Sequence, residues 1–145
     1  MRILITGGCG FVGSNLSIFL KKNLKKAKIE SLDSLFRNGS KINKERLKKL
    51  NIINHKIDIK NYKKISKLKK FDLVIDCCAE PAIETSSKDP DRIINTNLIG
   101  TYNLLKKCVV DNSNIIFLST SRVYSIKSLR SLIKIKNIKN KINIK

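Results

Sequence analysis

Long apolar runs are absent from this sequence of 145 residues. No stretch approaches the roughly 20 apolar residues that a membrane-spanning helix needs. The apolar run after Met1 and Arg2 is also too short for a signal peptide. We therefore expect a soluble, cytoplasmic protein with no membrane partner. The length is that of one ordinary domain, and a hydrophobic content of 41% is enough to form a core.

Residue patterns typical of metal or redox sites are also missing. The four cysteines, Cys9, Cys77, Cys78 and Cys108, form no CxxC pair, and the only histidine, His55, is not at a ligand-like spacing from them. The adjacent pair Cys77-Cys78 lies in an apolar run, where cysteine behaves as a small hydrophobic residue. We therefore expect buried, reduced thiols, no metal site, and a structural role for His55 within a strand.

Acidic residues are scarce, because 11 Asp and Glu stand against 31 Lys and Arg, which gives a net charge of +20. Such a charge can bind the phosphates of nucleic acid. The excess is mostly lysine, however, and it accompanies abundant isoleucine and asparagine, all of which have AT-rich codons. The sequence also shows no interleaved aromatic residues and no zinc-finger or RNA-recognition motif. We therefore predict no specific nucleic-acid partner, and a basic nucleic-acid-binding protein remains the remote alternative.

The remaining pattern alternates between strands and helices. Short apolar runs predict strands at residues 2–6, 29–33, 52–59, 71–79 and 114–121. Helical spacing predicts helices at residues 11–26, 44–50, 62–68 and 92–110, and Asn38-Gly39 predicts a turn. Strands that alternate with helices pair in parallel through right-handed crossovers. We expect an α/β fold with a doubly wound parallel sheet that ends after about the fifth strand.

Only six glycines occur, yet four of them lie between residues 7 and 13. The stretch "GGCGFVG" satisfies both GxGxxG and GxxGxxG, and it joins the first predicted strand to the first predicted helix. Glycines here allow a sharp turn, close approach of backbone to a pyrophosphate, and tight packing of the helix on the strands. Asp33 ends the next strand, where its carboxylate can bind a ribose 2′-OH and repel a 2′-phosphate. The pattern predicts a dinucleotide site that prefers NAD to NADP, although the nearby Arg37 favours the opposite choice.

These motifs resemble those of the extended short-chain dehydrogenase/reductases, the NAD-dependent epimerase/dehydratase family. The resemblance runs in order through "TGGCGFVG", "HKIDIKN", "CCAEPAIETSSKDP", "INTNLIGTYNLL" and "IIFLSTSRVY", from residue 1 to about 130. Within the family, "AEP", "NTNLIGT" and "STSRVYSI" look most like the CDP-paratose 2-epimerases, also called CDP-tyvelose epimerases. The resemblance implies a Rossmann-type fold, NAD as cofactor, and a nucleotide sugar, a CDP-linked deoxysugar, as substrate. A nucleotide-sugar 4-epimerase or dehydratase, and a non-catalytic dinucleotide-binding module, are the alternatives.

The resemblance also implies roles for the residues that match its motifs. Those near the pyrophosphate are Gly7, Gly10, Phe11, Val12 and Gly13. Those along the rest of the cofactor are Asp33 at the adenosine ribose, Asp58 and Ile59 at the adenine, and Cys77, Cys78, Ala79 and Asn97. Thr120 matches the catalytic Ser/Thr, which hydrogen-bonds the reacting sugar hydroxyl.

The sequence departs from the family pattern at the catalytic base. The family uses a Tyr-x-x-x-Lys that follows the Ser/Thr strand, where the lysine lowers the pKa of the tyrosine. Here Tyr102 and Lys106 have that spacing but precede Thr120, so we interpret them as a coincidence, and no tyrosine follows Tyr124. In addition, Asp76 and Cys77-Cys78 replace the usual His-Leu-Ala, and Ser125 replaces a common glycine.

The expected domain organisation follows from these departures. We expect an N-terminal part of an NAD-binding Rossmann domain at residues 1–126, a basic divergent tail at residues 127–145, and no C-terminal substrate lobe. The tail could form one more basic amphipathic segment or be frayed. Such a chain is expected to bind NAD, to be inactive alone, and to have a second copy or a separately encoded C-terminal half as its partner.

Overall fold

The computed structural model describes residues 1–81, 88–119, 125, 135–138 and 141–144. Five strands form one parallel sheet with the order β3-β2-β1-β4-β5, so the chain winds outward in both directions from β1. The strands are β1 (Arg2–Thr6), β2 (Lys28–Leu32), β3 (Ile53–His55), β4 (Leu73–Asp76) and β5 (Asn114–Phe117). The expected doubly wound parallel sheet is therefore confirmed.

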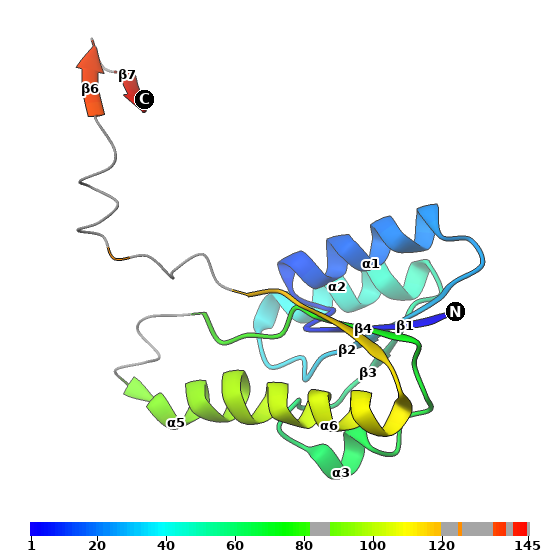
Figure 1. Cartoon of the computed structure of the whole chain (residues 1–145). Helices are drawn as coiled ribbons and strands as arrows, with labels where there is room; N and C mark the ends of the chain where they lie inside the picture. The colour runs from blue at the N-terminus through cyan, green and yellow to red at the C-terminus, as the bar shows by residue number, and fades with distance from the viewer. Residues whose placement is uncertain (82–87, 120–124, 126–134, 139–140, 145) are drawn as a thin grey trace.

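Helices cover both faces of this sheet. Figure 1 shows α1 and α2 together on one face, and α3, α5 and α6 on the other. The helical segments are α1 (Phe11–Asn23), α2 (Asn38–Lys49), α3 (Tyr62–Ile65), α5 (Pro90–Ile93), the π-helix η1 (Ile94–Gly100) and α6 (Thr101–Asp111). None of the helices in the described ranges is long and apolar enough to cross a membrane.

The core consists of two apolar layers, one on each face of the sheet. Along β1, Ile3 and Ile5 point into the layer under α1 and α2, where Leu47 is also fully buried. Leu4 points the other way and packs in the layer that contains Leu104 of α6. The central strand is therefore apolar on both faces, as expected for a parallel sheet covered by helices.

Several predicted boundaries are wrong, and hydrogen bonds at the element ends explain them. The first helix ends at Asn23 rather than residue 26, because Ala27 N–H bonds to Leu24 O and turns the chain into β2. The strand predicted at 52–59 has only three residues, since Ile57 N–H bonds back to His55 O. The strands predicted at 71–79 and 114–121 are likewise shorter, ending at Asp76 and Phe117.

The turn predicted at Asn38-Gly39 is also wrong, because both residues lie in the first turn of α2. This helix starts six residues before the predicted one, and burial of Ser40 holds its first turn against the core. The last predicted helix instead begins at Pro90, with Asp89 as N-cap: its Oδ1 accepts a bond of 3.0 Å from Arg92 N. In the basic tail, β6 (Ile135–Ile138) and β7 (Lys141–Ile144) pair antiparallel in a separate two-stranded sheet.

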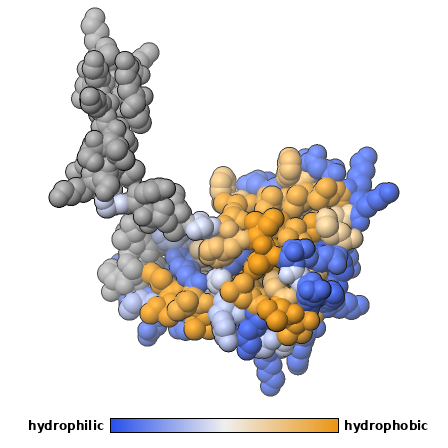
Figure 2. Space-filling model, in the orientation of Figure 1, coloured by the Kyte–Doolittle hydropathy of each residue, from blue (hydrophilic) through white to orange (hydrophobic). Residues whose placement is uncertain are grey.

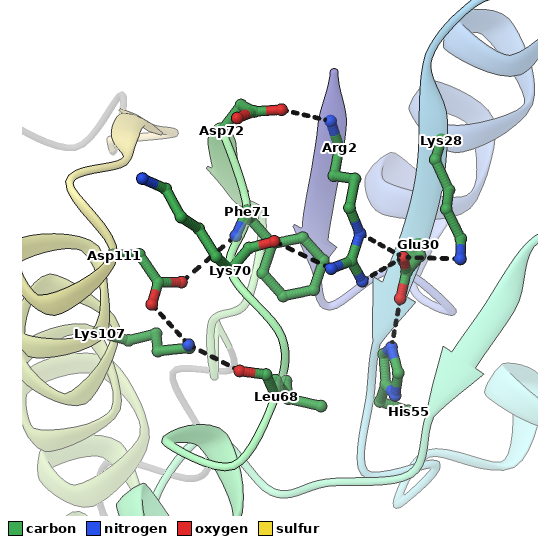
Figure 3. A network of polar contacts seen from close by, with 10 residues as sticks. All are labelled: Arg2, Lys28, Glu30, His55, Leu68, Lys70, Phe71, Asp72, Lys107 and Asp111. Atoms are coloured by element: carbon green, nitrogen blue, oxygen red, sulfur yellow. Dashed lines mark hydrogen bonds and ion pairs between the residues drawn. The ribbon is translucent and has the colours of Figure 1, made fainter.

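A buried carboxylate links the three strands on one side of the sheet. Glu30 of β2 accepts a 2.6 Å bond from Arg2 Nη2 of β1 and pairs with His55 Nε2 of β3 at 2.8 Å. Figure 3 shows these side chains converging on Glu30, with Lys28 also within reach at 3.7 Å. His55 therefore has the structural role that was predicted for it.

A second buried ion pair attaches α6 to the chain before β4. Lys107 Nζ pairs with Asp111 Oδ1 at 2.7 Å and donates to Leu68 O at 2.8 Å. The other oxygen of Asp111 accepts from Phe71 N at 3.3 Å, as Figure 3 shows. These contacts satisfy both charges inside the protein and fix the position of α6 relative to the sheet.

Candidate functional site

A cavity of about 540 Å³ lies at the carboxyl ends of the strands, where the strand order reverses on either side of β1. This switch point is where doubly wound folds bind ligands. Eight of the predicted cofactor residues line the cavity: Gly7, Gly10, Asp33, Asp58, Ile59, Cys77, Cys78 and Ala79. Phe11, Val12, Gly13 and Asn97 do not line it, and Thr120 lies outside the described residues.

The glycine turn between β1 and α1 forms one wall of the cavity. Gly7 has a φ of +57°, and a Cβ there would lie 2.8 Å from Cys77 O. Its carbonyl accepts the N–H of Gly10 at 2.8 Å, which closes the turn. A Cβ on Gly13 would collide with the backbone of Gly7, so the third glycine serves packing. A Cβ on Gly10 would meet only Gly7 O, at 3.0 Å, so Gly10 presents bare backbone to the cavity.

The start of α1 adjoins the same wall, because its N-cap residue lines the cavity. Gly10 is the N-cap residue of α1, and no side chain caps the helix. The first N–H groups of a helix have no partner within it, and the positive end of the helix dipole favours an anion there. Phe11 is 83% exposed, and neither Phe11 nor Val12 lines the cavity. We therefore expect these residues to contribute to ligand binding only through their backbone N–H groups.

Asp33, directly after β2, joins two loops at the cavity. Its Oδ2 accepts a 3.0 Å bond from Cys9 N in the glycine turn, and its Oδ1 accepts a 2.8 Å bond from Leu35 N. A carboxylate oxygen can accept two hydrogen bonds, so each oxygen keeps capacity for a ligand hydroxyl. Asp33 therefore positions the turn and can also bind a ribose.

Asp58 and Ile59 also line the cavity. Asp58 is half exposed and pairs with Lys60 Nζ at 3.4 Å. Ile59 is buried under Gly100, where a Cβ would lie 2.5 Å from an Ile59 methyl carbon, and its carbonyl accepts from Asn103 Nδ2 at 3.1 Å. These contacts fix the segment after β3 to η1 and α6, and they thereby hold Asp58 and Ile59 at the cavity.

Cys77 and Cys78 line the cavity and are only partly buried, unlike Cys9 and Cys108, so the expectation of buried thiols holds for two of the four. Burial raises the pKa of Cys77 to about 11 and that of Cys78 to about 12, and the charge of Asp76 adds to both shifts. These thiols are therefore protonated near neutral pH and poor nucleophiles. They form part of the cavity wall, and the described residues contain no cluster suited to a metal.

Asp76, the last residue of β4, is buried beneath this wall. Its Oδ1 accepts from Thr6 Oγ1 and from Cys78 N at 3.1 Å, and its Oδ2 accepts from Thr101 Oγ1 at 3.4 Å. Burial raises the pKa of Asp76, although these hydrogen bonds oppose the shift. The carboxyl group thus ties β1, β4 and α6 together under the cavity.

Asn97 lies behind the cavity wall rather than in it. Its Oδ1 accepts a 2.8 Å bond from Glu80 N, and its Nδ2 donates to Glu80 O at 3.2 Å. Asn97 therefore holds the backbone of residue 80 by both of its polar groups. In this structure it positions the chain after β4.

Sequence reasoning missed a charged cluster on the cavity wall. Glu80 accepts from Arg37 Nη2 and from Arg92 Nη2, each at 2.6 Å, and the Arg92 guanidinium lies 4.0 Å over the Phe36 ring. All four residues line the cavity. Glu80 lies within the "AEP" motif, but nothing in the neighbouring sequence indicates its partners in two other segments.

Comparison with known proteins identifies the family. The profile of the NAD dependent epimerase/dehydratase family matches residues 3–134. The chain belongs to this family. A dTDP-D-glucose 4,6-dehydratase of Dictyostelium discoideum is 37% identical and is matched over 85% of this chain and 30% of that protein. The CDP-paratose 2-epimerase of Salmonella typhi is also 37% identical, over 86% of this chain and 38% of its own length.

Solved structures of the family have the same fold. Pal from Bacillus thuringiensis superposes with a TM-score of 0.74 at 29% identity, over 86% of this chain and 41% of that one. The UDP-glucose 4-epimerase of Thermus thermophilus, solved as a complex with NAD, has a TM-score of 0.68 at 26% identity, over 83% of this chain and 38% of that one. The chain thus spans between 30% and 41% of the length of the four relatives named here.

Proposed function

We propose that this chain is the NAD-binding part of a nucleotide-sugar epimerase similar to CDP-paratose 2-epimerase, with residues 1–126 as its NAD-binding domain. The observation that carries the proposal is the cavity at the strand ends, where the bare backbone of Gly10 and the carboxylate of Asp33 lie on one wall. Family membership and the NAD-bound relative from Thermus thermophilus support it.

The residues present fit the cofactor. The first-turn N–H groups of α1 and the backbone of Gly10 would hold the pyrophosphate, Asp33 would bind the adenosine ribose, and Asp58 and Ile59 would flank the adenine. NAD, when bound, supplies a reversible hydride acceptor for a sugar carbon. The chain's own contribution is to bind and orient it, because the Tyr-x-x-x-Lys base expected after Thr120 is missing from the sequence.

A sugar-nucleotide dehydratase is the second candidate. The dehydratase of Dictyostelium discoideum has the same 37% identity to this chain as the 2-epimerase of Salmonella typhi. The two activities share the cofactor site and differ in the fate of the oxidised sugar. A non-catalytic dinucleotide-binding module is the remaining alternative, and it would bind NAD without turnover even when a separately produced C-terminal half is added.

Titration calorimetry of the purified chain with NAD tests the proposal. We expect the wild type to bind and Gly10→Val to lose binding, because the new side chain would extend from the turn into the space for the pyrophosphate. Gly39→Val is the matched control, since a Cβ there meets nothing within 4 Å and Gly39 does not line the cavity. Circular dichroism would establish that each variant is folded. Absence of NAD binding by the folded wild type at millimolar concentration, or equal binding by Gly10→Val, would contradict the proposal.

A further inference from the structure

Glu80 is a buried carboxylate shared by two arginines at the cavity wall. Its side chain is only 4% exposed, and its two oxygens accept from different partners, Oε1 from Arg37 and Oε2 from Arg92, both at 2.6 Å. Asn97 fixes the backbone of Glu80 through two hydrogen bonds. The backbone that carries this carboxylate is therefore held by the fold independently of the arginines.

The two arginines differ in how firmly they are held. Arg92 is 29% exposed and stacks on the Phe36 ring, so it has a second support besides Glu80. The side chain of Arg37 is 54% exposed and is held to the cavity wall through Glu80. Arg37 lies four residues after Asp33, between β2 and α2, and both residues line the cavity, so Arg37 is the guanidinium that we pair with a group at the proposed ribose site.

Among the described residues, the lining of the cavity is acidic although the protein is strongly basic. Five of these lining residues are carboxylates and three are basic, whereas the net charge of the whole chain is +20. The acidic residues are Asp33, Asp58, Glu80, Asp89 and Asp91, and the basic residues are Arg37, Lys60 and Arg92. Such a lining disfavours an additional phosphate dianion, unless one of the cations is released from its partner.

We propose that Glu80 determines the choice between NAD and NADP by keeping Arg37 engaged. This inference rests on the NAD site proposed above. A planar guanidinium binds a phosphate through two charge-assisted hydrogen bonds, and Arg37 would do so with the 2′-phosphate of NADP if it were free. With Arg37 bound to Glu80, only Asp33 distinguishes NAD from NADP at the ribose. Its carboxylate accepts a hydrogen bond from the 2′-OH of NAD and repels the 2′-phosphate of NADP.

The test is the ratio of the dissociation constants for NAD and NADP, measured by titration calorimetry at low salt. Glu80→Gln removes the charge and keeps the shape and the backbone bonds to Asn97. We expect it to shift the ratio toward NADP by about tenfold or more. Arg37→Met alone should leave the ratio within about twofold of wild type, and the double variant should return to the wild-type ratio. Arg92→Met is the matched control and should not shift the ratio toward NADP.

The other possible results separate failure of this inference from failure of the proposed function. A folded wild type that binds neither dinucleotide overturns both the proposed function and this inference. A wild type that binds NAD while Glu80→Gln leaves the ratio unchanged overturns only the inference. A shift toward NADP that persists in the double variant also overturns it, because Arg37 would not then be the group that receives the phosphate. If Glu80→Gln does not fold, Glu80→Asp, whose shorter side chain cannot span both arginines, must shift the ratio in the same direction.

Discussion

At the scale of single residues, glycines of one motif have different functions. Gly10 leaves space that opens into the cavity, whereas Gly13 leaves space that the backbone of Gly7 occupies. A side chain at Gly10 should therefore act on the ligand, and one at Gly13 on the fold. The motif predicts both close backbone approach and tight helix packing, and the atoms around each glycine show which position has open space and which is packed.

We predict that Gly13→Ala lowers the free energy of unfolding by about 1–3 kcal/mol, the usual cost of inserting a group into a packed site. The cause is the collision of the new Cβ with the carbonyl of Gly7, which cannot move without disturbing the turn. Urea denaturation followed by circular dichroism measures the change. Gly39→Ala is the control and should raise stability by about 0.5–1 kcal/mol, since it lies in a helix with open space around it. Equal stabilities of Gly13→Ala and wild type would contradict the prediction.

At the scale of elements, the pairing of β1, β2 and β3 depends on one buried charge. Burial acts to raise the pKa of Glu30, but the hydrogen bonds and charges of Arg2 and His55 outweigh it and hold the pKa below the ordinary value of 4.5. A carboxyl group whose pKa is lower in the folded state stabilises the fold above its unfolded pKa. That contribution is lost as the pH falls through the lowered pKa.

We therefore predict that Glu30→Gln lowers the free energy of unfolding by about 1–3 kcal/mol at pH 7, the usual cost of losing hydrogen bonds to a charged group. The difference from wild type should shrink as the pH falls below 4.5, because protonation of Glu30 then removes the same charge from the wild type. Urea denaturation at pH 7, 5, 4 and 3 provides the comparison. Glu45→Gln, on the exposed surface of α2, should be nearly neutral at every pH. A deficit of Glu30→Gln that is the same at pH 7 and pH 3 would argue against the role of the charge.

Local sequence patterns were sufficient to predict which strands form, but not where each strand or helix begins and ends. The five strands and their parallel pairing followed from short apolar runs between helical segments, which is a local signal. The apolar runs did not predict the strand lengths. The strand predicted at 52–59 ends at His55, because the N–H of Ile57 bonds back to His55 O. The start of α2 was predicted wrongly because the composition of Asn38-Gly39 is typical of a turn. In the structure, the burial of Ser40 and Leu47 favours a helix over this segment instead.

At the scale of the whole molecule, the Tyr102–Lys106 pair does not form a catalytic base at the cavity. Both residues lie on α6, Tyr102 is 56% exposed, and neither lines the cavity. Lys106 Nζ lies 4.0 Å over the ring of Tyr62 and 5.6 Å from the centre of the Tyr102 ring. This geometry agrees with the interpretation of the spacing as a coincidence.

The surface near β5 is another property of the whole chain. Figure 2 shows apolar side chains gathered on the face where β5 crosses in front of the sheet in Figure 1. β5 is at the edge of the sheet order, and Ile116, Phe117 and Leu118 are all exposed. An apolar area of this kind is typical of a surface that another segment or chain covers.

We predict that the 145-residue chain does not epimerise CDP-paratose or CDP-tyvelose in the presence of NAD. General-base catalysis is typically worth about 10²–10⁴-fold, and a threonine hydroxyl such as that of Thr120 is far too weak a base near pH 7. Chromatography for the epimer and absorbance for transient NADH would measure turnover. Tyr102→Phe should behave as the wild type does.

Two results would change this view of the chain. Turnover by the chain alone that Tyr102→Phe abolishes would show that Tyr102 is the base after all. Turnover that appears only when a separately produced C-terminal half is added would identify a split enzyme. The apolar residues of β5 would then be the first place to test for contact with the added half.

The sequence by itself determined the strand, glycine turn and helix, the alternation behind the parallel sheet, and the position of Asp33 after β2, because each depends on neighbouring residues or on a regular period. Only the tertiary structure decided which distant side chains meet. Glu80 reaches Arg37 across 43 positions of the sequence, and Glu30 meets His55 across 25. Such contacts depend on strand order and loop course, which bring residues together without any local pattern to mark them. For the same reason, the sequence indicated a dinucleotide site, and only the fold revealed the carboxylate of Glu80 that Arg37 and Arg92 share on its wall.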